Sequence, residues 1–411
     1  MPYYRKVGEV PPKRHTQFRQ PDGRLYAEEL MSQEGFSFSS SLLYHREIPT
    51  AIVKAEAVDD QPASSYAGCT PNLPLQPRLL HTHDLGAGGD LVTGRQLLLA
   101  NEDLRMSYVA ATRPSELYRD GIGDECVYVE SGRVVLESIY GRLEAGPGDY
   151  VVVPTSTTHR WLPQGDEPVR ALVVESRGHI GPPARYFTKY GQLKEGAPYC
   201  ERDIHGPDGP LVEPDTEAQV LVRHRAGLTR FTYAHHPFDV VGWDGFVYPY
   251  RFNIHDFEPI TGRVHQPPPV HQTFEGPNFV LCSFVPRLFD YDPLAVAVPY
   301  NHANVDSDEV LFYVGGDFMS RKGAGIGMGS ITLHPSGFTH GPQPGSVEAG
   351  LGKAATDELA VMVDTFRPLH LGPAGRACEA GEYAWSWARG EQARGDGRGE
   401  PEPPPAPMMT D

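Results

Sequence analysis

The chain has 411 residues, with 36 Lys and Arg against 53 Asp and Glu, and a formal net charge of −17 at pH 7. This acidic balance argues against nucleic acid and anionic membrane surfaces as partners, because both attract clustered Lys and Arg. The 44 Gly and 40 Pro exceed average usage and favour short strands joined by frequent turns. The composition therefore predicts an all-β, β-rich fold of one large or two medium domains.

Targeting signals and cysteine usage bear on the compartment. No apolar run approaches the roughly 18 residues of a membrane span, and the start, "MPYYRKVGEVPPKRH", has no apolar core of a signal peptide. The five cysteines are widely spaced and form no C-x-x-C pair. We therefore expect reduced thiols, a cytoplasmic location and no membrane partner.

In chain order, "RLYAEELMS" (24–32) is expected to form a short helix, and strand patterns run from about residue 76 to 175. Strand patterns return at about residue 246, and the C-terminal end shows no apolar periodicity. The expected organisation is an N-terminal barrel (1–180), a connector (181–245), a C-terminal catalytic barrel (246–388) and a disordered tail (389–411).

An internal repeat supports two barrels. In each copy a Glu is followed seven residues later by Gly, and a later Gly is followed by five residues, Pro-x-Ser or Pro-x-Gly, two residues and His. The six anchor positions are Glu125, Gly132, Gly148, Pro154, Ser156 and His159 in the first copy, and Glu309, Gly316, Gly329, Pro335, Gly337 and His340 in the second. Two copies with matching spacing predict two jelly-roll barrels descended from one.

The second copy carries a candidate metal site. His302 and Asn304 precede its first strand in the pattern H-x-N-x4-E, and period-two alternation puts both on one face. The mouth of an antiparallel barrel then brings His302 close to Glu309 and His340. Two imidazoles and one carboxylate form the facial triad of non-haem Fe(II) oxygenases, although the same donors suit Mn, Ni or Zn.

The first copy does not carry this set. Counting back from Glu125, Tyr118 takes the place of His302, and Asp120 takes the place of Asn304. Glu125 and His159 alone make a poor metal site, so we expect a hydrogen-bonded pair without a metal in the N-terminal barrel.

The spacings G-x5-P-x-G-x2-H and H-x-N-x4-E-x6-G resemble the paired motifs of the cupin superfamily. Within it, "VVGWDGFVYPYRFN" (240–253), "PYNHANVDSDE" (299–309) and "LHPSGFTHGPQPG" (333–345) resemble homogentisate 1,2-dioxygenase, especially its shorter bacterial branch. The resemblance implies Fe(II)-dependent, extradiol-type ring cleavage of a 2,5-dihydroxyphenyl acid in tyrosine catabolism, with both atoms of O₂ incorporated. It also implies a homo-oligomer, a trimer or a hexamer.

Carried over residue by residue, the iron ligands of this family fall on His302, Glu309 and His340. The family glutamate follows its histidine one residue sooner, which makes Asp308 the fallback ligand. Glu309 is preferred because it alone leaves Gly316 at the cupin spacing.

Other family positions concern protons and substrate. The proton-handling histidine falls on His271 in "PPPVHQTF", with His265 as a rival, and a histidine near the substrate side chain falls on His334. The family's substrate-binding tyrosine is Phe318 here. Because such hydroxyl contacts discriminate between substrates, gentisate, hydroquinone-type and other para-dihydroxy aromatics stay open beside homogentisate.

The substrate carboxylate calls for a bidentate Arg, and Arg287 and Arg321 are the candidates, with Asn304 also expected to face the substrate. The expected partners are therefore a small aromatic acid and O₂. Two other classes compete with this interpretation. A cupin isomerase or decarboxylase would share the metal residues, whereas a non-catalytic binding or storage protein would usually have lost them in both copies.

Overall fold

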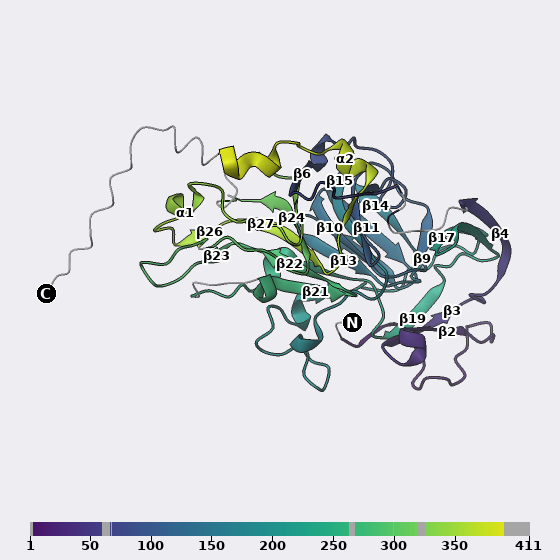
Figure 1. Ribbon diagram of the computed structural model, residues 1–411. Coiled ribbons are helices and arrows are strands. Elements are labelled where there is room, and N and C mark those ends of the chain that lie inside the picture. The colour runs from purple at the N-terminus through teal and green to yellow at the C-terminus, as the bar shows by residue number, and fades with distance from the viewer. Residues whose placement is uncertain are drawn as a thin grey trace, which may run out of the picture.

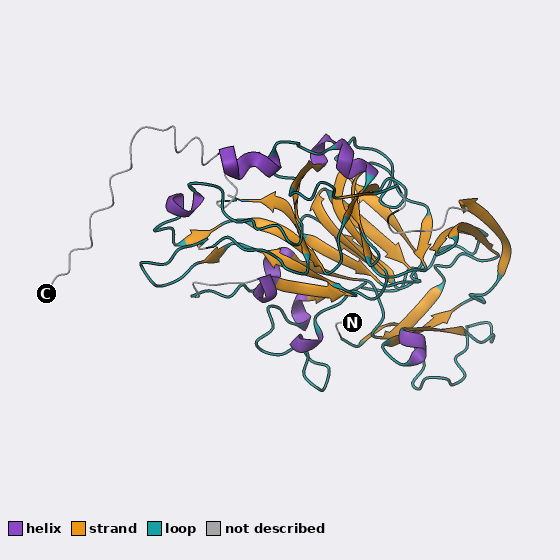
Figure 2. Cartoon of the chain, viewed as in Figure 1, coloured by secondary structure: helices purple, strands orange, loops and turns teal. Residues whose placement is uncertain are grey.

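The computed structural model describes residues 3–59, 66, 68–262, 268–298, 300–316, 318 and 325–389. Strands dominate this part of the chain, and short helical segments lie at its periphery (Figure 1, Figure 2). The predicted all-β fold is therefore confirmed. Within the described ranges, no helix is both long and apolar enough to cross a membrane.

Two large sheets form the first barrel. One has nine strands, in the order β16 (Ile204–His205), β20 (Tyr250–Asn253), β13 (Asp149–Val153), β10 (Glu125–Ser131), β15 (Val169–Ser176), β8 (Leu104–Ala111), β7 (Gln96–Ala100), β28 (His370–Leu371) and β5 (Thr70–Pro71). The other has seven, in the order β12 (Gly141–Ala145), β11 (Arg133–Ser138), β14 (His159–Gln164), β9 (Leu117–Asp120), β17 (Ala218–His224), β18 (Gly227–Tyr233) and β4 (Ile52–Asp59).

Apolar side chains fill the space between these two sheets. Val127 and Val151 from the nine-stranded sheet belong to one buried cluster with Leu136 and Trp161 from the seven-stranded sheet. All four side chains are fully buried. Alternation along each strand explains this, because every second residue points into the barrel.

The second barrel is built on a six-stranded sheet. Its order is β21 (Gln272–Gly276), β22 (Phe279–Phe284), β27 (Leu359–Thr365), β24 (Asp308–Gly315), β25 (Ser330–His334) and β6 (Arg78–His81), and a two-stranded sheet pairs β23 (Arg287–Leu288) with β26 (Ala355–Thr356). One face of the six-stranded sheet packs on the nine-stranded sheet, where Tyr128 contacts Phe312 edge to face with ring centroids 6.2 Å apart. Both rings belong to the largest apolar cluster of the described residues, which joins the two barrels.

The sheets do not divide the chain at the expected boundaries. β6, from the expected N-terminal barrel, pairs with β25 of the six-stranded sheet. β20, from the expected C-terminal barrel, pairs with β13 of the nine-stranded sheet. The two barrels therefore exchange strands, and the boundaries at 180 and 245 remain predictions for folding units.

A further sheet of four strands has the order β1 (Arg5–Gly8), β19 (Val240–Gly245), β3 (Ser40–His45) and β2 (Ala27–Ser32). β2 corrects the helix expected over 24–32, since its residues pair with β3 from Ala27 opposite His45 to Ser32 opposite Ser40. Sheet pairing overrides the helix-forming residues of this segment.

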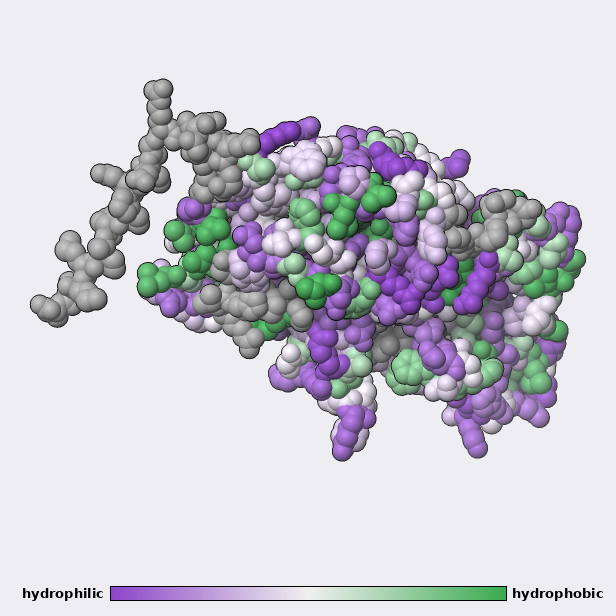
Figure 3. All heavy atoms as spheres, in the orientation of Figure 1, coloured by the Kyte–Doolittle hydropathy of each residue, from purple (hydrophilic) through white to green (hydrophobic). Residues whose placement is uncertain are grey.

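The described helical segments are short. They are α1 (Ser346–Ala349), α2 (Pro373–Ala377) and the 3₁₀ turns η1 (Glu34–Phe36), η2 (Thr82–Asp84), η3 (Ala184–Tyr186), η4 (Glu201–Asp203), η5 (Ile254–Asp256), η6 (Pro268–His271) and η8 (Tyr383–Trp385), after which residues 386–389 are also helical. The surface in Figure 3 mixes hydrophilic and hydrophobic side chains. The expected tail lies, from residue 390 onward, outside the described residues.

The repeat seen in the sequence is also a repeat of backbone conformation. The three pairs of equivalent turn positions, Gly132 and Gly316, Gly148 and Gly329, and Ser156 and Gly337, all have positive φ, from 66° to 89°. At Gly316 an added Cβ would also collide with the carbonyl oxygen of Asp357. Glycine permits this conformation without steric cost, so the spacing marks the corners of both barrels.

Candidate metal centre

The three residues predicted to bind a metal meet at the mouth of the second barrel. Nε2 of His340 lies 3.3 Å from Oε1 of Glu309, and Nε2 of His302 lies 3.6 Å from Oε2 of the same carboxylate. One potential ligand atom from each residue lies within 4.8 Å of the other two. We call His302, Glu309 and His340 the triad.

Backbone pairing fixes the two histidines. His302 and His340 exchange two backbone hydrogen bonds, 2.7 and 2.8 Å long, and form an isolated β-bridge. Glu309 is the first residue of β24 whose side chain points into the barrel. The β-bridge supplies the two histidines and β24 supplies the carboxylate, and the three side chains point to one place. The side chain of His302 is 35% exposed whereas that of Glu309 is buried, which leaves the cluster open on the side of His302.

The charge of Glu309 suits a cation. Burial by itself would raise the pKa of Glu309, but hydrogen bonds with His302, His334 and His340 outweigh it and hold the pKa well below its ordinary value. Glu309 is therefore a carboxylate at neutral pH, the form in which it ligates metals. Nε2 of His340 is buried beside this carboxylate, 3.3 Å from Oε1 of Glu309, and a cation shared by the imidazole nitrogen and the carboxylate fits there.

His334 lies beside the carboxylate. Its Nδ1 is 2.9 Å from Oε1 of Glu309, and its Nε2 is 2.8 Å from the hydroxyl of Tyr383. The ring also stacks on His340, with centroids 4.1 Å apart. A direct contact between His334 and a substrate would require one of the two hydrogen bonds to break, so the structure favours a role for His334 in orienting Glu309.

The fallback ligand Asp308 points elsewhere. Its two oxygens accept hydrogen bonds of 2.8 Å from the backbone N–H groups of Ser336 and Leu369. In the first copy, Asp124 accepts the equivalent bond from Thr155 N–H at 2.8 Å. Asp308 therefore holds the strand to the following turn, and Glu309 is the residue that provides the carboxylate of the triad.

Sequence reasoning missed a second acidic residue. Asp364 of β27 stands opposite Glu309 of β24, and its Oδ1 is buried without a hydrogen bond. Burial and the charge of Glu309 raise the pKa of Asp364 to about 8. Asp364 could have been singled out from the sequence, because it is the acidic residue in the strand "LAVMVDT", whose other residues are mostly apolar.

Farther along β24, the same face of the sheet carries aromatic residues. Tyr313, four residues after Glu309, contacts the ring of Phe318 with centroids 4.6 Å apart. Across the sheet, His271 stacks on Phe284 at 4.4 Å, and the guanidinium carbon of Arg287 lies 5.8 Å from the Phe284 centroid. We call this face, from Glu309 to Tyr313 and across to Phe284, the inner face.

Strand register connects these aromatic residues. Phe284 stands opposite Ala360, and Ala360 stands opposite Tyr313. Four strand residues span about 13 Å, so the aromatic end of the inner face lies roughly that far from Glu309 along β24. Tyr313 is buried, and its hydroxyl lies 3.1 Å from that of Thr332, which places a phenolic hydroxyl beside Phe318.

The remaining predicted site residues are placed as follows. Asn304 lies next to the triad, with its Nδ2 3.5 Å from Oε2 of Glu309. Arg287 also donates a hydrogen bond of 2.8 Å to Glu358, which fixes its position at the corner between β23 and β26. His265 and Arg321 lie outside the described residues.

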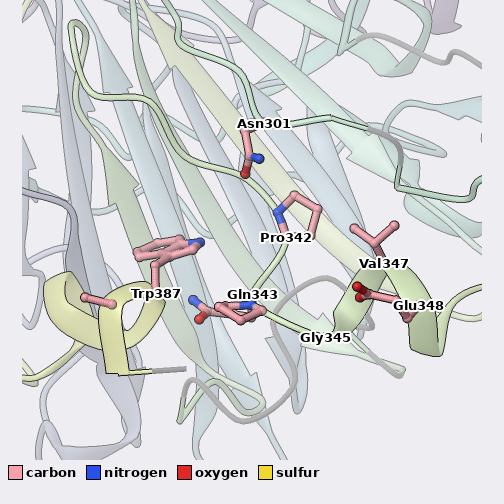
Figure 4. Close-up of a pocket in the computed structure, with 9 residues that line it drawn as sticks. Asn301, Pro342, Gln343, Gly345, Val347, Glu348 and Trp387 are labelled. Atoms are coloured by element: carbon pink, nitrogen blue, oxygen red, sulfur yellow. The ribbon is translucent and has the colours of Figure 1, made fainter. Parts of the chain in front are cut away.

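A pocket of about 490 Å³ adjoins the backbone of the triad (Figure 4). Asn301, which precedes His302, and Pro342, which follows His340 by two residues, line it together with Gln343, Glu348 and Trp387. In Figure 4, Trp387 comes from one helical segment and Glu348 from α1 on the opposite side. The indole N–H of Trp387 donates to the carbonyl of Gly341 at 3.2 Å, so this wall packs against the outside of the β-bridge.

The first barrel repeats this backbone plan without the metal residues. Tyr118 pairs with His159 where His302 pairs with His340, as the sequence count predicted. Ser156 N–H donates to Asp120 at 2.7 Å, and Gly337 N–H donates to the equivalent Asn304 carbonyl at 3.3 Å.

Arginines fill the centre of the first barrel. Arg95 donates to both oxygens of Glu125, at 2.5 and 3.1 Å, and to Glu175 at 3.1 Å. Arg223 donates to Glu175 at 2.5 Å and to Asp120 at 2.9 Å. Although three carboxylates cluster here, the guanidinium groups supply their positive partners, so these residues do not fit a metal site.

Comparison with known proteins agrees with this architecture. The family model described as "Cupin domain" matches residues 114–175, which carry the first copy of the repeat. The chain is 38% identical over 391 residues to "Putative dioxygenase SSO1533" of Saccharolobus solfataricus, covering 94% of this chain and 99% of that protein. The fold and the paired motifs thus define a two-barrel cupin.

Two more distant relatives indicate which cupin family the chain belongs to. Identity to homogentisate 1,2-dioxygenase of Emericella nidulans is 25% over 366 residues, covering 82% of this chain and 78% of that enzyme. Identity to the enzyme of the same name from Bradyrhizobium diazoefficiens is 26% over 261 residues, covering 60% of this chain and 56% of that one. The chain belongs to the family of cupin dioxygenases related to homogentisate 1,2-dioxygenase.

Proposed function

We propose that this cupin dioxygenase uses Fe(II) to cleave the ring of a 2,5-dihydroxyphenyl acid, with homogentisate as the first choice. The observation that carries the proposal is the convergence of His302, Glu309 and His340 on one point of the second barrel. Dioxygenases among the relatives of the chain support the same chemistry.

The triad would hold the metal through two imidazole nitrogens and one carboxylate. Two His and one carboxylate with open positions are typical of non-haem Fe(II) oxygenases. When bound, Fe(II) would supply the redox-active centre that couples the aromatic ring to O₂. His334 would keep the Glu309 carboxylate in orientation through its hydrogen bond of 2.9 Å.

The inner face would orient the substrate. An aromatic acid lying along it would place one ring hydroxyl at the triad and its carboxylate toward Arg287 at the aromatic end. His271, stacked on Phe284 at that end, is the proposed group for the proton of the other ring hydroxyl, because an imidazole nitrogen can accept a proton. Holding the ring and O₂ together inside a barrel supplies rate through proximity.

The reaction balances without a further reductant. One ring carbon–carbon bond breaks, and both oxygen atoms of O₂ enter the product, which is a maleyl-type acid such as maleylacetoacetate. All four electrons that reduce O₂ come from the dihydroxy aromatic ring, so no nicotinamide or flavin is required.

Phe318 favours a second candidate substrate class. The family tyrosine at this position is absent, and the hydroxyl beside it comes from Tyr313. Gentisate or a hydroquinone-type compound would suit a site with an altered hydrogen-bond donor.

The experiment is oxygen uptake by protein purified without O₂ and loaded with Fe(II). The panel contains homogentisate, gentisate and unsubstituted hydroquinone. The proposal predicts one O₂ consumed for each ring cleaved, with homogentisate turned over fastest. Turnover of any panel member in the absence of O₂ would instead indicate an isomerase or a decarboxylase.

A further inference from the structure

Among the described residues, β4 is a free edge of the seven-stranded sheet. It is the last strand in the sheet order, and the described strand that pairs with it is β18. All residues from Ile52 to Val58 are exposed. At the other edge, a Cβ added to Gly141 of β12 would collide with the carbonyl of Gly209, so that edge is covered by the chain.

The exposed edge carries apolar side chains. Ile52, Val53 and Val58 are 43%, 60% and 49% exposed. Figure 1 places β4 at the right-hand rim of the molecule, and hydrophobic side chains gather at the same end in Figure 3. An exposed edge with unpaired backbone groups and apolar residues is a template for pairing with another strand.

The sequence of β4, "IVKAEAVD", is self-complementary in an antiparallel arrangement. If Ala55 stands opposite Ala55 of a second copy, Lys54 stands opposite Glu56 of the partner subunit, and Glu56 opposite Lys54 of the partner subunit. Val53 then faces Ala57 of the partner subunit. A register centred on residue 54 or 56 would instead place two lysines or two glutamates directly opposite each other, which is destabilising.

We propose that β4 pairs with β4 of a second copy of this chain, antiparallel and centred on Ala55. Such a two-fold contact is isologous and joins the two seven-stranded sheets across one edge. Lys54 and Glu56 already form an ion pair of 2.8 Å within the strand, and both side chains are exposed. Exchanging this pair for two pairs between copies costs little, because exposed ion pairs contribute little to stability.

The regular part of the edge defines the contact. The register of β4 against β18 shifts at Val53 and at Val58 and is regular from Lys54 to Ala57. The contact is therefore centred on these four residues. It is independent of the proposed enzyme activity, because the triad lies in a different sheet.

The test is a disulfide cross-link in the Cys200→Ser background, which removes the exposed native thiol. Ala55→Cys should give a covalent dimer on mild oxidation with diamide, because the two-fold axis places residue 55 opposite itself. The matched control is Ala57→Cys, on the same face of the strand, whose copy would lie about 13 Å away, too far for a disulfide. Val53→Cys combined with Ala57→Cys should restore the cross-link.

Equal cross-linking of Ala55→Cys and Ala57→Cys would overturn the proposed register, and no cross-link with either would overturn the interface. Sedimentation of the holoenzyme gives a second measurement. Lys54→Glu and Glu56→Lys should each weaken association by roughly 5- to 10-fold, and the double exchange should restore it. Identical sedimentation of the wild type and both single variants would contradict the proposal, whatever other interface the chain uses.

Discussion

Replacing Arg95 with Met removes a cation from the centre of the first barrel. The guanidinium lies between Glu125 and Glu175, and the exposed fractions of these three side chains are 7%, 1% and 6%. Met is unbranched, like the aliphatic stem of Arg, and carries no charge, so the substitution keeps much of the volume while it deletes the ion pair. It tests the account in which the first barrel is held together by ion pairs, not by a metal.

The expected loss of stability in Arg95→Met follows from the charges that remain in the cluster. Without Arg95, Asp120 and Glu175 keep their ion pairs with Arg223, and Glu175 also keeps Arg105 at 3.6 Å, whereas Glu125 loses the guanidinium that is bonded to it. Breaking a buried pair by deleting one partner costs about 3–5 kcal/mol. Burial already raises the pKa of Asp120 to about 7, so proton uptake there offsets part of the loss near neutral pH. We expect the free energy of unfolding to fall by about 3 kcal/mol at pH 7, and by less at pH 6 than at pH 8.

A milder variant serves as the control. Glu125→Gln leaves Arg95, Arg105 and Arg223 each paired with Glu175 or Asp120, so its expected cost is smaller, about 1–2 kcal/mol. Urea unfolding followed by tryptophan fluorescence measures the free energy of unfolding of both variants, and metal analysis measures iron per chain. Both variants should retain iron while folded. Loss of iron from Arg95→Met without a loss of stability would refute the reasoning, because it would place metal binding in the first barrel.

Three further predictions concern protons, substrate and pH. His271→Asn should retain iron but lower turnover in the oxygen-uptake assay by roughly 10²- to 10⁴-fold, and unchanged turnover would remove His271 from the reaction. Phe318→Tyr should change the ratio of kcat/KM between homogentisate and gentisate by roughly 10- to 100-fold, and a constant ratio would show that position 318 does not face the substrate. Buried His45 would have a low pKa from desolvation alone, but hydrogen bonds to Asp239 and Glu29 raise it to about 9 from an ordinary 6.5. Its stabilisation is therefore fully present below pH 6.5 and lost as the pH rises through about 9, so His45→Gln should cost about 2–3 kcal/mol at pH 6 and little at pH 10 in urea unfolding.

The sequence was sufficient to predict that the three side chains of the triad lie close together, for identifiable physical reasons. Strand alternation decides which residues face inward, and the glycine corners fix the length of each hairpin. The choice of Glu309 over Asp308 followed from the distance to Gly316, and Asp308 indeed turns to backbone N–H groups. The β-bridge between His302 and His340 follows from the same repeat.

Other features could not be predicted, because they depend on contacts between distant segments. Arg95 and Glu125 are 30 residues apart, and Arg223 and Asp120 are 103 apart, with no spacing rule that connects them. The exchange of β6 and β20 between sheets likewise depends on how the two barrels pack.

Whether the second barrel binds the iron is tested most directly by comparing equivalent histidines in the two copies of the repeat. His340 and His159 lie in equivalent turns of the two barrels, and in each the Nδ1 atom is close to the carbonyl oxygen two residues earlier, at 3.3 and 2.9 Å. The measurement is iron per chain, together with O₂ consumed with homogentisate, for His340→Ala and His159→Ala. We expect His340→Ala to lose both iron and oxygen uptake, whereas His159→Ala keeps both near the wild-type values. Retention of iron by His340→Ala, with loss from His159→Ala, would contradict this expectation.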